Sequence, residues 1–123
     1  MLNVPQPLTI SADRIHPDTL PGYVHLKVID LDNQVMFYQQ VIGLQLNWRE
    51  GNSAGLGIEG RDLVRLTQIA KGRRYRGVTG IYHFAILFPN RRELARAVAR
   101  LFSMRWQNYP TDHIMTKTTY VDD

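Results

Sequence analysis

Residues 80–90 read GIYHFAILFPN, and this stretch decides the fold because the chain contains its pattern twice. Ile81–Phe88 is rich in aromatic and β-branched residues and stops at Pro89, which predicts a buried strand. The stretch Gly22–Leu31, GYVHLKVIDL, has the same form. Three identical pairs are each 58 positions apart: Gly22 and Gly80, His25 and His83, Trp48 and Trp106. The sequence therefore predicts two copies of one supersecondary unit.

The composition is that of an ordinary globular domain. The chain has 123 residues, of which 44% are hydrophobic and 21% charged, and a chain of this length buries roughly two thirds of its unfolded surface. Cysteine is absent, which excludes disulfides, thiolate metal sites and cysteine nucleophiles. No apolar run approaches the about 20 residues that span a bilayer, so we expect a cytoplasmic protein without a membrane partner.

The net charge of +4 raises the question of nucleic acid. Much of the excess is local, in the connector 71–76 and in five arginines from Arg91 to Arg105. No aromatic–basic interleaving or nucleic-acid motif accompanies these residues, so we expect no nucleic-acid partner.

An N-terminal arm precedes the first unit. Residues 1–21 hold four of the six prolines and no amphipathic period, so we expect an extended arm that packs over the domain. The domain, residues 22–123, begins with a strand at Tyr23–Ile29, in which His25 faces away from the apolar side chains. An Asp30 or Asp32 cap begins the next helix, and Gly43 ends it. Its buried stripe comprises Val35, Phe37, Tyr38, Val41 and Ile42.

Three short strands complete a β-α-β-β-β unit over residues 22–70, at 44–49, 54–58 and 63–67. The second unit, residues 80–123, continues from Ile81–Phe88 into a helix that Asn90 caps, with Glu93 in a capping-box position. Its apolar stripe is Leu94, Ala97, Val98 and Leu101. Thr111–Tyr120 supplies one or two strands, and the last strand is missing before the end of the chain. The predicted fold class is α+β, with paired βαβββ modules.

His25 and His83 occupy equivalent places in the two units. If the units pack as a pseudo-twofold pair, both imidazoles face one concave surface, and such a pair begins a metal site for Fe, Mn, Ni or Zn. The alternative is that each is a half-buried strand histidine that hydrogen-bonds to its neighbours. A third ligand is usually a carboxylate, and neither Glu59 nor Asp62 is well placed for that role.

These patterns resemble the vicinal oxygen chelate superfamily of glyoxalases, bleomycin-resistance proteins and extradiol dioxygenases. The closest likeness is to the amino-terminal domain of catechol-2,3-dioxygenase-like proteins. Ile15–Val28, IHPDTLPGYVHLKV, resembles the opening I-H-P-x-T-x-x-G-x-V-x-L-K-V of those proteins. Asp112–Asp123, DHIMTKTTYVDD, resembles the first part of their D-H-x-x-[ST]-x-x-x-Y-x-x-D-P-x-G-N-x-x-E.

The resemblance implies metal ligands at His25 and His83, with a Glu ligand roughly ten residues beyond Tyr120, past the end of this chain. It also implies that Tyr120 is the active-site tyrosine and that His113 assists it. From the residues alone, Tyr120 is an ordinary cross-strand aromatic, and His113 is a loop histidine. The implied cofactor is Fe(II) or Mn(II), which would chelate a catechol-like aromatic substrate and leave a position for O2. In two-domain members the active metal site commonly lies in the carboxy-terminal half, so a module with no bound metal is also expected.

Three functions stay open at this stage. The first is a ring-cleaving extradiol dioxygenase domain, as an incomplete or N-terminal module. The second is a metal-free module that is structural or binds a small molecule, as in bleomycin resistance, and the third is a glyoxalase- or epimerase-type enzyme. Fold does not choose among them. The missing strand also leaves an open sheet edge, so we expect a homodimer that covers it.

Overall fold

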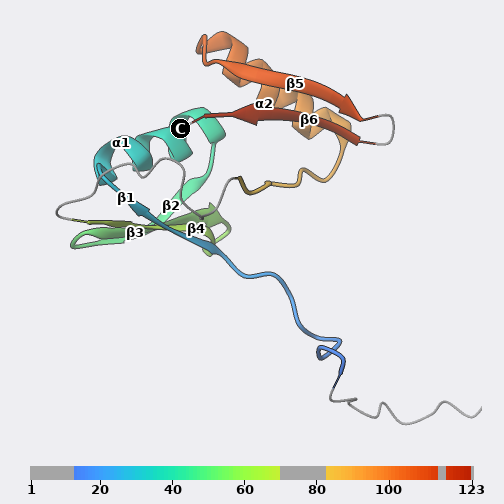
Figure 1. The fold of residues 1–123 in the computed structure, drawn as a ribbon. Coiled ribbons are helices and arrows are strands. Elements are labelled where there is room, and N and C mark those ends of the chain that lie inside the picture. The colour runs from blue at the N-terminus through green and yellow to red at the C-terminus, as the bar shows by residue number, and fades with distance from the viewer. Residues whose placement is uncertain (1–12, 70–82, 114–115, 123) are drawn as a thin grey trace, which may run out of the picture.

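The structure is a computed structural model that describes residues 13–69, 83–113 and 116–122, without the side chains of 111–116. It has three layers (Figure 1). A four-stranded sheet lies at one side, and the helices α1 (Leu31–Met36) and η1 (Phe37–Ile42) cover one of its faces. Beyond them lie α2 (Arg91–Ser103) and the hairpin of β5 (Asn108–His113) and β6 (Thr116–Val121). The predicted α+β class is confirmed.

The four-stranded sheet forms from the first unit. Its order is β1 (Val24–Val28), β4 (Arg61–Gln68), β3 (Ser53–Ile58) and β2 (Gln45–Glu50). β1 and β4 are parallel, and the other pairs are antiparallel. Alternation sets the faces, because successive side chains in a strand point to opposite sides. The fully buried side chains of β3 and β4 face the helices: Ala54, Leu56, Val64 and Leu66.

Two register shifts interrupt the alternation on neighbouring strands. Leu56 pairs with Val64 and Gly57 pairs with Asp62, so Leu63 is an extra residue in β4. Between the pairs of Leu46 and Trp48 with β3, Asn47 is likewise an extra residue in β2. A bulge of this kind turns a side chain toward the other face of the sheet. The strand ranges predicted for this unit are right to within a few residues. The sequence patterns did not indicate the bulges.

The segment 31–42 is helical, as predicted, but its first half is an α-helix and its second half a π-helix. The Asp30 carboxylate caps α1, since Asp30 Oδ1 accepts a hydrogen bond from the Asn33 amide at 3.1 Å. η1 is a π-helix, and at its end Gly43 N donates to Tyr38 O at 3.0 Å. Such π segments are rare and often occur at functional sites. Four residues of the predicted stripe are core, since Val35, Phe37, Tyr38 and Val41 are buried, and the fifth, Ile42, is partly buried against them.

Gly43, at the end of η1, lies where the second unit contacts the first. Its φ of 92° is left-handed, the conformation in which glycine costs least. It also leaves space for Arg100 of α2, whose Nη1 donates to the Ile42 carbonyl at 3.1 Å. A Cβ at position 43 would lie 1.8 Å from Arg100 Nη1. The second unit therefore caps the helix of the first.

In the second unit, α2 matches its prediction and the preceding strand does not. Asn90 Oδ1 accepts a hydrogen bond from the Glu93 amide at 2.9 Å, which confirms the cap. The prediction of a strand at Ile81–Phe88 is wrong for its described part, since residues 83–88 belong to no strand. The burial of these residues nevertheless alternates, with Phe84 and Ile86 against the core. Alternation fixes which side chains are buried, whereas a strand also needs a hydrogen-bonded neighbour.

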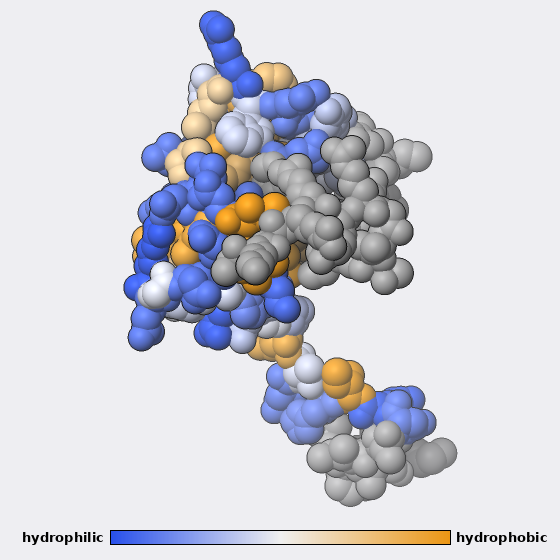
Figure 2. All heavy atoms as spheres, turned by 60° about the vertical axis from the view of Figure 1, so that its left-hand side comes forward, coloured by the Kyte–Doolittle hydropathy of each residue, from blue (hydrophilic) through white to orange (hydrophobic). Residues whose placement is uncertain are grey.

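The described part of the arm, residues 13–22, runs away from the body instead of packing over it (Figure 1). Ile15 and Leu20 are about four-fifths exposed, and Figure 2 shows apolar groups among hydrophilic ones along the outstretched segment. Among the described helices, none is long and apolar enough to cross a membrane.

The close approach at Gly43 predicts an unusually costly glycine substitution. Gly43→Ala should lower the free energy of unfolding by about 2 kcal/mol, because the left-handed backbone is strained and Arg100 loses the Ile42 carbonyl. Urea unfolding measures the change.

The matched control is Gly51→Ala. Gly51 also has a positive φ, 56°, but nothing lies within 4 Å of an added Cβ. Gly51→Ala should therefore lower the free energy of unfolding only by the backbone strain, about 1 kcal/mol. Equal costs at the two positions would contradict the capping role of Arg100.

Candidate functional site

His25 lies in a row of side chains that crosses the open face of the sheet. The row is set by register: His25 pairs with Arg65, Arg65 with Gly55, and Gly55 with Trp48. Cross-strand partners share a face, and this face is opposite to the buried leucines and valines. The helices α1 and η1 cover the other face (Figure 1), so His25 lies on the face away from them.

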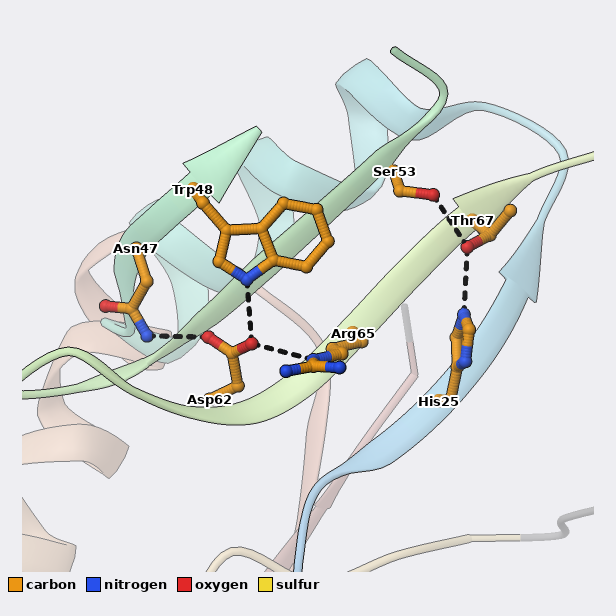
Figure 3. Close-up of polar contacts among 7 residues, drawn as sticks. All are labelled: His25, Asn47, Trp48, Ser53, Asp62, Arg65 and Thr67. Carbon is orange, nitrogen blue, oxygen red and sulfur yellow. Dashed lines mark hydrogen bonds and ion pairs between the residues drawn. The ribbon is translucent and has the colours of Figure 1, made fainter. Parts of the chain in front are cut away.

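The Thr67 hydroxyl contacts the imidazole of His25, and the Ser53 hydroxyl contacts Thr67 in turn. His25 Nε2 and Thr67 Oγ1 are 2.8 Å apart, and Thr67 Oγ1 is 2.9 Å from Ser53 Oγ (Figure 3). Ser53 and Thr67 are direct partners on β3 and β4, and Thr67 is diagonal to His25. His25 is thus a strand histidine hydrogen-bonded to a neighbour, but it is exposed and not half-buried.

Asp62 is the centre of a second network on the same face. Its carboxylate accepts hydrogen bonds from Asn47 Nδ2 at 2.8 Å, Trp48 Nε1 at 2.7 Å and Arg65 Nε at 2.8 Å (Figure 3). Burial alone raises the pKa of Asp62, but these hydrogen bonds and the charge of Arg65 together lower it. Asp62 therefore remains ionised although its side chain is only 8% exposed, because three donors enclose the carboxylate.

The two bulges and Gly55 make this network possible. Asn47 and Trp48 are consecutive and would point to opposite faces of a regular strand, but the bulge in β2 lets both reach one carboxylate. The bulge in β4 does the same for Asp62 and Arg65. Gly55 lies beneath them, and a Cβ there would be 2.1 Å from Trp48 Nε1 and 2.6 Å from Asp62 Oδ2.

A large cavity lies on the other side of the helices. It has a volume of about 1170 Å³ and is lined by η1, residues 83–88, α2 and the hairpin. His83 and Tyr120 both line it, with ring centroids 6.2 Å apart in an edge-on arrangement. Aromatic side chains form much of its wall: Phe37, Tyr38, Phe84, Phe88 and Tyr109. This wall fits a flat apolar ring, and the hydroxyl and imidazole supply polar groups beside it.

The structure brings together two of the four predicted site residues. His83 and Tyr120 meet in the cavity, whereas His25 is not among the residues that line it. His113 lies in β5 opposite Thr116, and its side chain is outside the described residues.

A complete metal site does not fit the residues that the structure describes. All histidines and acidic residues of the chain have described side chains except Asp112, His113 and Asp123. No three of the described ones lie close enough together to hold a metal ion. A two-histidine, one-carboxylate site needs three such groups, so His25 and His83 do not form one here.

The sequence patterns missed the roles of Trp48, Asp62, Arg65 and Thr67. One available signal was the polar residue at every other position of β4, where Arg65 and Thr67 alternate with Val64 and Leu66. Asp62 follows no such alternation because the bulge at Leu63 shifts it.

The lowered pKa of Asp62 predicts a pH-dependent stability. Ionised Asp62 stabilises the folded state above its ordinary pKa of 3.8, and this contribution is lost as the pH falls below that value. Asp62→Asn should therefore lower the free energy of unfolding by about 1–2 kcal/mol near pH 7, and by progressively less in acid. Urea unfolding at several pH values measures the difference.

Asp32→Asn is the control for this effect. The Asp32 carboxylate pairs with Arg49 but is 81% exposed, so its loss should change stability by less than about 1 kcal/mol at every pH. A constant gap between the wild type and Asp62→Asn across the pH range would contradict the linkage.

Comparisons with known proteins place the chain in a family. Residues 21–123 match the family model of the Glyoxalase/Bleomycin resistance protein/Dioxygenase superfamily. The catechol-2,3-dioxygenase of Bacillus subtilis (strain 168) is 36% identical over 112 residues, which are 89% of this chain and 39% of that protein. The chain thus spans about two fifths of the length of this relative.

Two solved structures share the fold at 14% identity and a TM-score of 0.59. One is an E126Q mutant of the fosfomycin resistance protein FosX from Listeria monocytogenes, complexed with Mn(II) and 1S,2S-dihydroxypropylphosphonic acid, with 83% of each chain covered. The other is a protein from the mobile metagenome of V. Pseudocholerae, with 89% of this chain and 90% of that one covered. With the family match over residues 21–123, these findings show that the chain belongs to the glyoxalase, bleomycin resistance protein and dioxygenase superfamily.

Proposed function

We propose that this chain is a module of a catechol-2,3-dioxygenase-like protein and that its cavity holds a small, catechol-like aromatic molecule. The observation that carries the proposal is the meeting of His83 and Tyr120, 6.2 Å apart, in a cavity walled by aromatic rings. The 36% identical relative is a catechol-2,3-dioxygenase, which supports a ring with two adjacent oxygens as the ligand.

The cavity offers the contacts that such a molecule requires. Its ring would pack against the apolar wall, where the rings of Tyr38 and Phe84 are stacked with their centroids 6.4 Å apart. The Tyr120 hydroxyl would hydrogen-bond to an oxygen of the ligand, and His83 beside it would bind the other oxygen. Pockets for small ligands combine a broad apolar wall with a few polar groups in this way.

A divalent metal, Fe(II) or Mn(II), belongs to the proposal as a cofactor of the whole protein. His25 and His83 would be its imidazole ligands and Tyr120 and His113 the residues that act on the substrate. The Mn(II) complex of FosX supports a metal in this superfamily. The site requires His25 and His83 to come together with a carboxylate, an arrangement that the described residues do not have.

A metal-free module that binds a small molecule is the second candidate. It is favoured by the hydrogen bond between His25 Nε2 and Thr67 Oγ1 and by the location of His25 outside the cavity. In this case aromatic packing and hydrogen bonds alone hold the ligand.

Two earlier expectations remain predictions. β1 and β2 are the outer strands of the sheet, and we expect a second copy of the chain to cover one of them in a homodimer. Sedimentation as a monomer at micromolar concentration would exclude it. The cytoplasmic location also stays a prediction.

The catechol proposal predicts a loss of affinity in one cavity variant. Tyr120→Phe removes the hydroxyl and keeps the ring, so the Kd for catechol should rise about five- to tenfold, as expected for one hydrogen bond. Titration calorimetry under anaerobic conditions measures it. Tyr23→Phe is the control, because Tyr23 lies outside the cavity. An unchanged Kd in Tyr120→Phe would count against the cavity as the catechol site.

Metal binding separates the two candidates. If His25 and His83 are ligands, the protein binds Fe(II) or Mn(II) stoichiometrically under anaerobic conditions, and both His25→Ala and His83→Ala abolish binding. His16→Ala should bind as the wild type does, since His16 lies in the arm. Absence of metal from the wild type, with catechol still bound, would leave the metal-free module.

A further inference from the structure

The apolar stripe of α2 is only partly covered by the rest of the chain. Among the stripe residues predicted from the sequence, Leu101 is buried, whereas Leu94, Ala97 and Val98 are half-buried. An amphipathic helix draws most of its stability from the burial of its apolar stripe. Part of this helix face is therefore left to a contact that the described residues do not make.

The uncovered part of the stripe lines a groove between α2 and the hairpin, which we call the α2 groove. Its volume is about 390 Å³. Four of the residues that line it are apolar: Leu94, Ala95, Val98 and Pro110. The charged residues that line it are Arg91 and Lys117, and both are basic. The α2 groove therefore matches an apolar segment that carries acidic residues beside its apolar side chains.

The described part of the N-terminal arm has this composition. Its large apolar side chains, Ile15 and Leu20, are about four-fifths exposed and are not covered by the body of the chain. The residues of this segment that are charged at pH 7 are Asp13, Arg14 and Asp18, so acidic charge is in excess. The arm and the α2 groove are thus complementary in apolar character and in charge.

A closed turn lies between the two apolar side chains of the arm. Thr19 N donates to the His16 carbonyl at 3.0 Å, and Asp18 N donates to His16 Nδ1 at 3.1 Å. Pro17 restricts the backbone inside the turn because its ring locks φ. A segment that is already ordered loses less conformational entropy when it binds.

The geometry places the α2 groove of the same chain out of reach of Leu20. The arm leaves the body at β1, in the sheet layer, whereas the groove lies beyond α1 and η1, in the layer of α2 and the hairpin (Figure 1). Leu20 precedes the first residue of β1, Val24, by four positions, and four extended residues span at most about 14 Å. Two steps between packed layers amount to about 20 Å. Leu20 therefore reaches this groove only in another molecule.

We propose that the arm, residues 13–20, docks into the α2 groove of a second copy of this chain. Ile15 and Leu20 contact the apolar residues of the groove, and the acidic side chains of the arm lie beside Arg91 and Lys117. When two copies exchange arms, the contact closes into a symmetric dimer. The proposal names a surface other than the outer strands of the sheet, and it depends on neither the catechol cavity nor a metal.

Disulfide cross-linking tests this contact directly, because the chain contains no cysteine. Leu20→Cys and Ala95→Cys are made in separate chains, and both positions are exposed, so the fold should tolerate the substitutions. Oxidation of the mixture should give a covalent dimer that contains one copy of each variant, which mass spectrometry identifies.

The control mixture contains Ser103→Cys in place of Ala95→Cys. Ser103 is also exposed on α2, but it does not line the α2 groove. Its mixture with Leu20→Cys should therefore give little mixed dimer. Cross-linking that is no greater with Ala95→Cys than with Ser103→Cys would overturn the proposal.

A substitution in the arm measures its contribution to dimer formation. Leu20→Ser should raise the Kd of the dimer about tenfold or more, because the burial of a leucine side chain is lost. Sedimentation equilibrium measures this Kd. Leu87→Ser is the control, since Leu87 is 96% exposed and does not line the α2 groove, and its Kd should equal that of the wild type. An unchanged Kd in Leu20→Ser would refute the arm as the contact.

The same measurements separate this contact from pairing at an edge of the sheet. A dimer that Leu20→Ser weakens, and that cross-links between positions 20 and 95, is held by exchanged arms. A dimer that Leu20→Ser leaves unchanged, without that cross-link, is held elsewhere, and the arm proposal is wrong. Neither measurement involves catechol or metal, so the proposed function stands or fails separately.

Discussion

The burial of residues 31–44 between two surfaces is the constraint on which the rest of the structure depends. One side of this segment lies on the sheet, and the other meets the second unit. The Phe37 ring is 5.3 Å from that of Trp106, the Tyr38 ring is 6.4 Å from that of Phe84, and Leu101 is buried beside them. An α-helix presents one apolar stripe, whereas the π segment at 37–42 turns neighbouring aromatic side chains toward different partners. The wall of the cavity is therefore a product of the same packing that joins the units.

The face of the sheet away from the helices depends on a different constraint, which is register. A regular β2 and β4 would place Asn47 and Trp48 on opposite faces and separate Asp62 from Arg65. One extra residue in each strand brings the other three side chains to the carboxylate of Asp62. The glycine beneath them is required because a Cβ at Gly55 would overlap the indole. Bulges commonly re-aim side chains next to binding sites, and here they order Arg65.

Sequence patterns predicted most of the first unit and less of the second. Alternation and capping chemistry located the strands of the sheet, the Asp30 and Asn90 caps and the buried stripe of 31–42, because these depend on local spacing. The strand predicted at Ile81–Phe88 was wrong over residues 83–88, because pairing depends on a partner that spacing does not specify. The bulges and the π-helical segment were also not predicted, because they too depend on partners that spacing along the chain does not specify. For the candidate site, the structure brings His83 and Tyr120 together and leaves His25 outside the cavity, and the roles of these residues stay predictions.

The two repeat-related histidines have come to occupy different surroundings. His25 is on the open sheet face beside Thr67, and His83 is in the cavity beside Tyr120. The hydrogen bond to Thr67 is worth about 1 kcal/mol, whereas a structural metal ion contributes about 10 kcal/mol or more to the free energy of its site. That bond alone would therefore not keep His25 from a metal. What separates the two imidazoles is the backbone, because β1 belongs to a sheet and residues 83–88 pair with no described strand. The packing of Phe84 on Tyr38 helps to hold residues 83–88, and with them His83, on the cavity side of the helices.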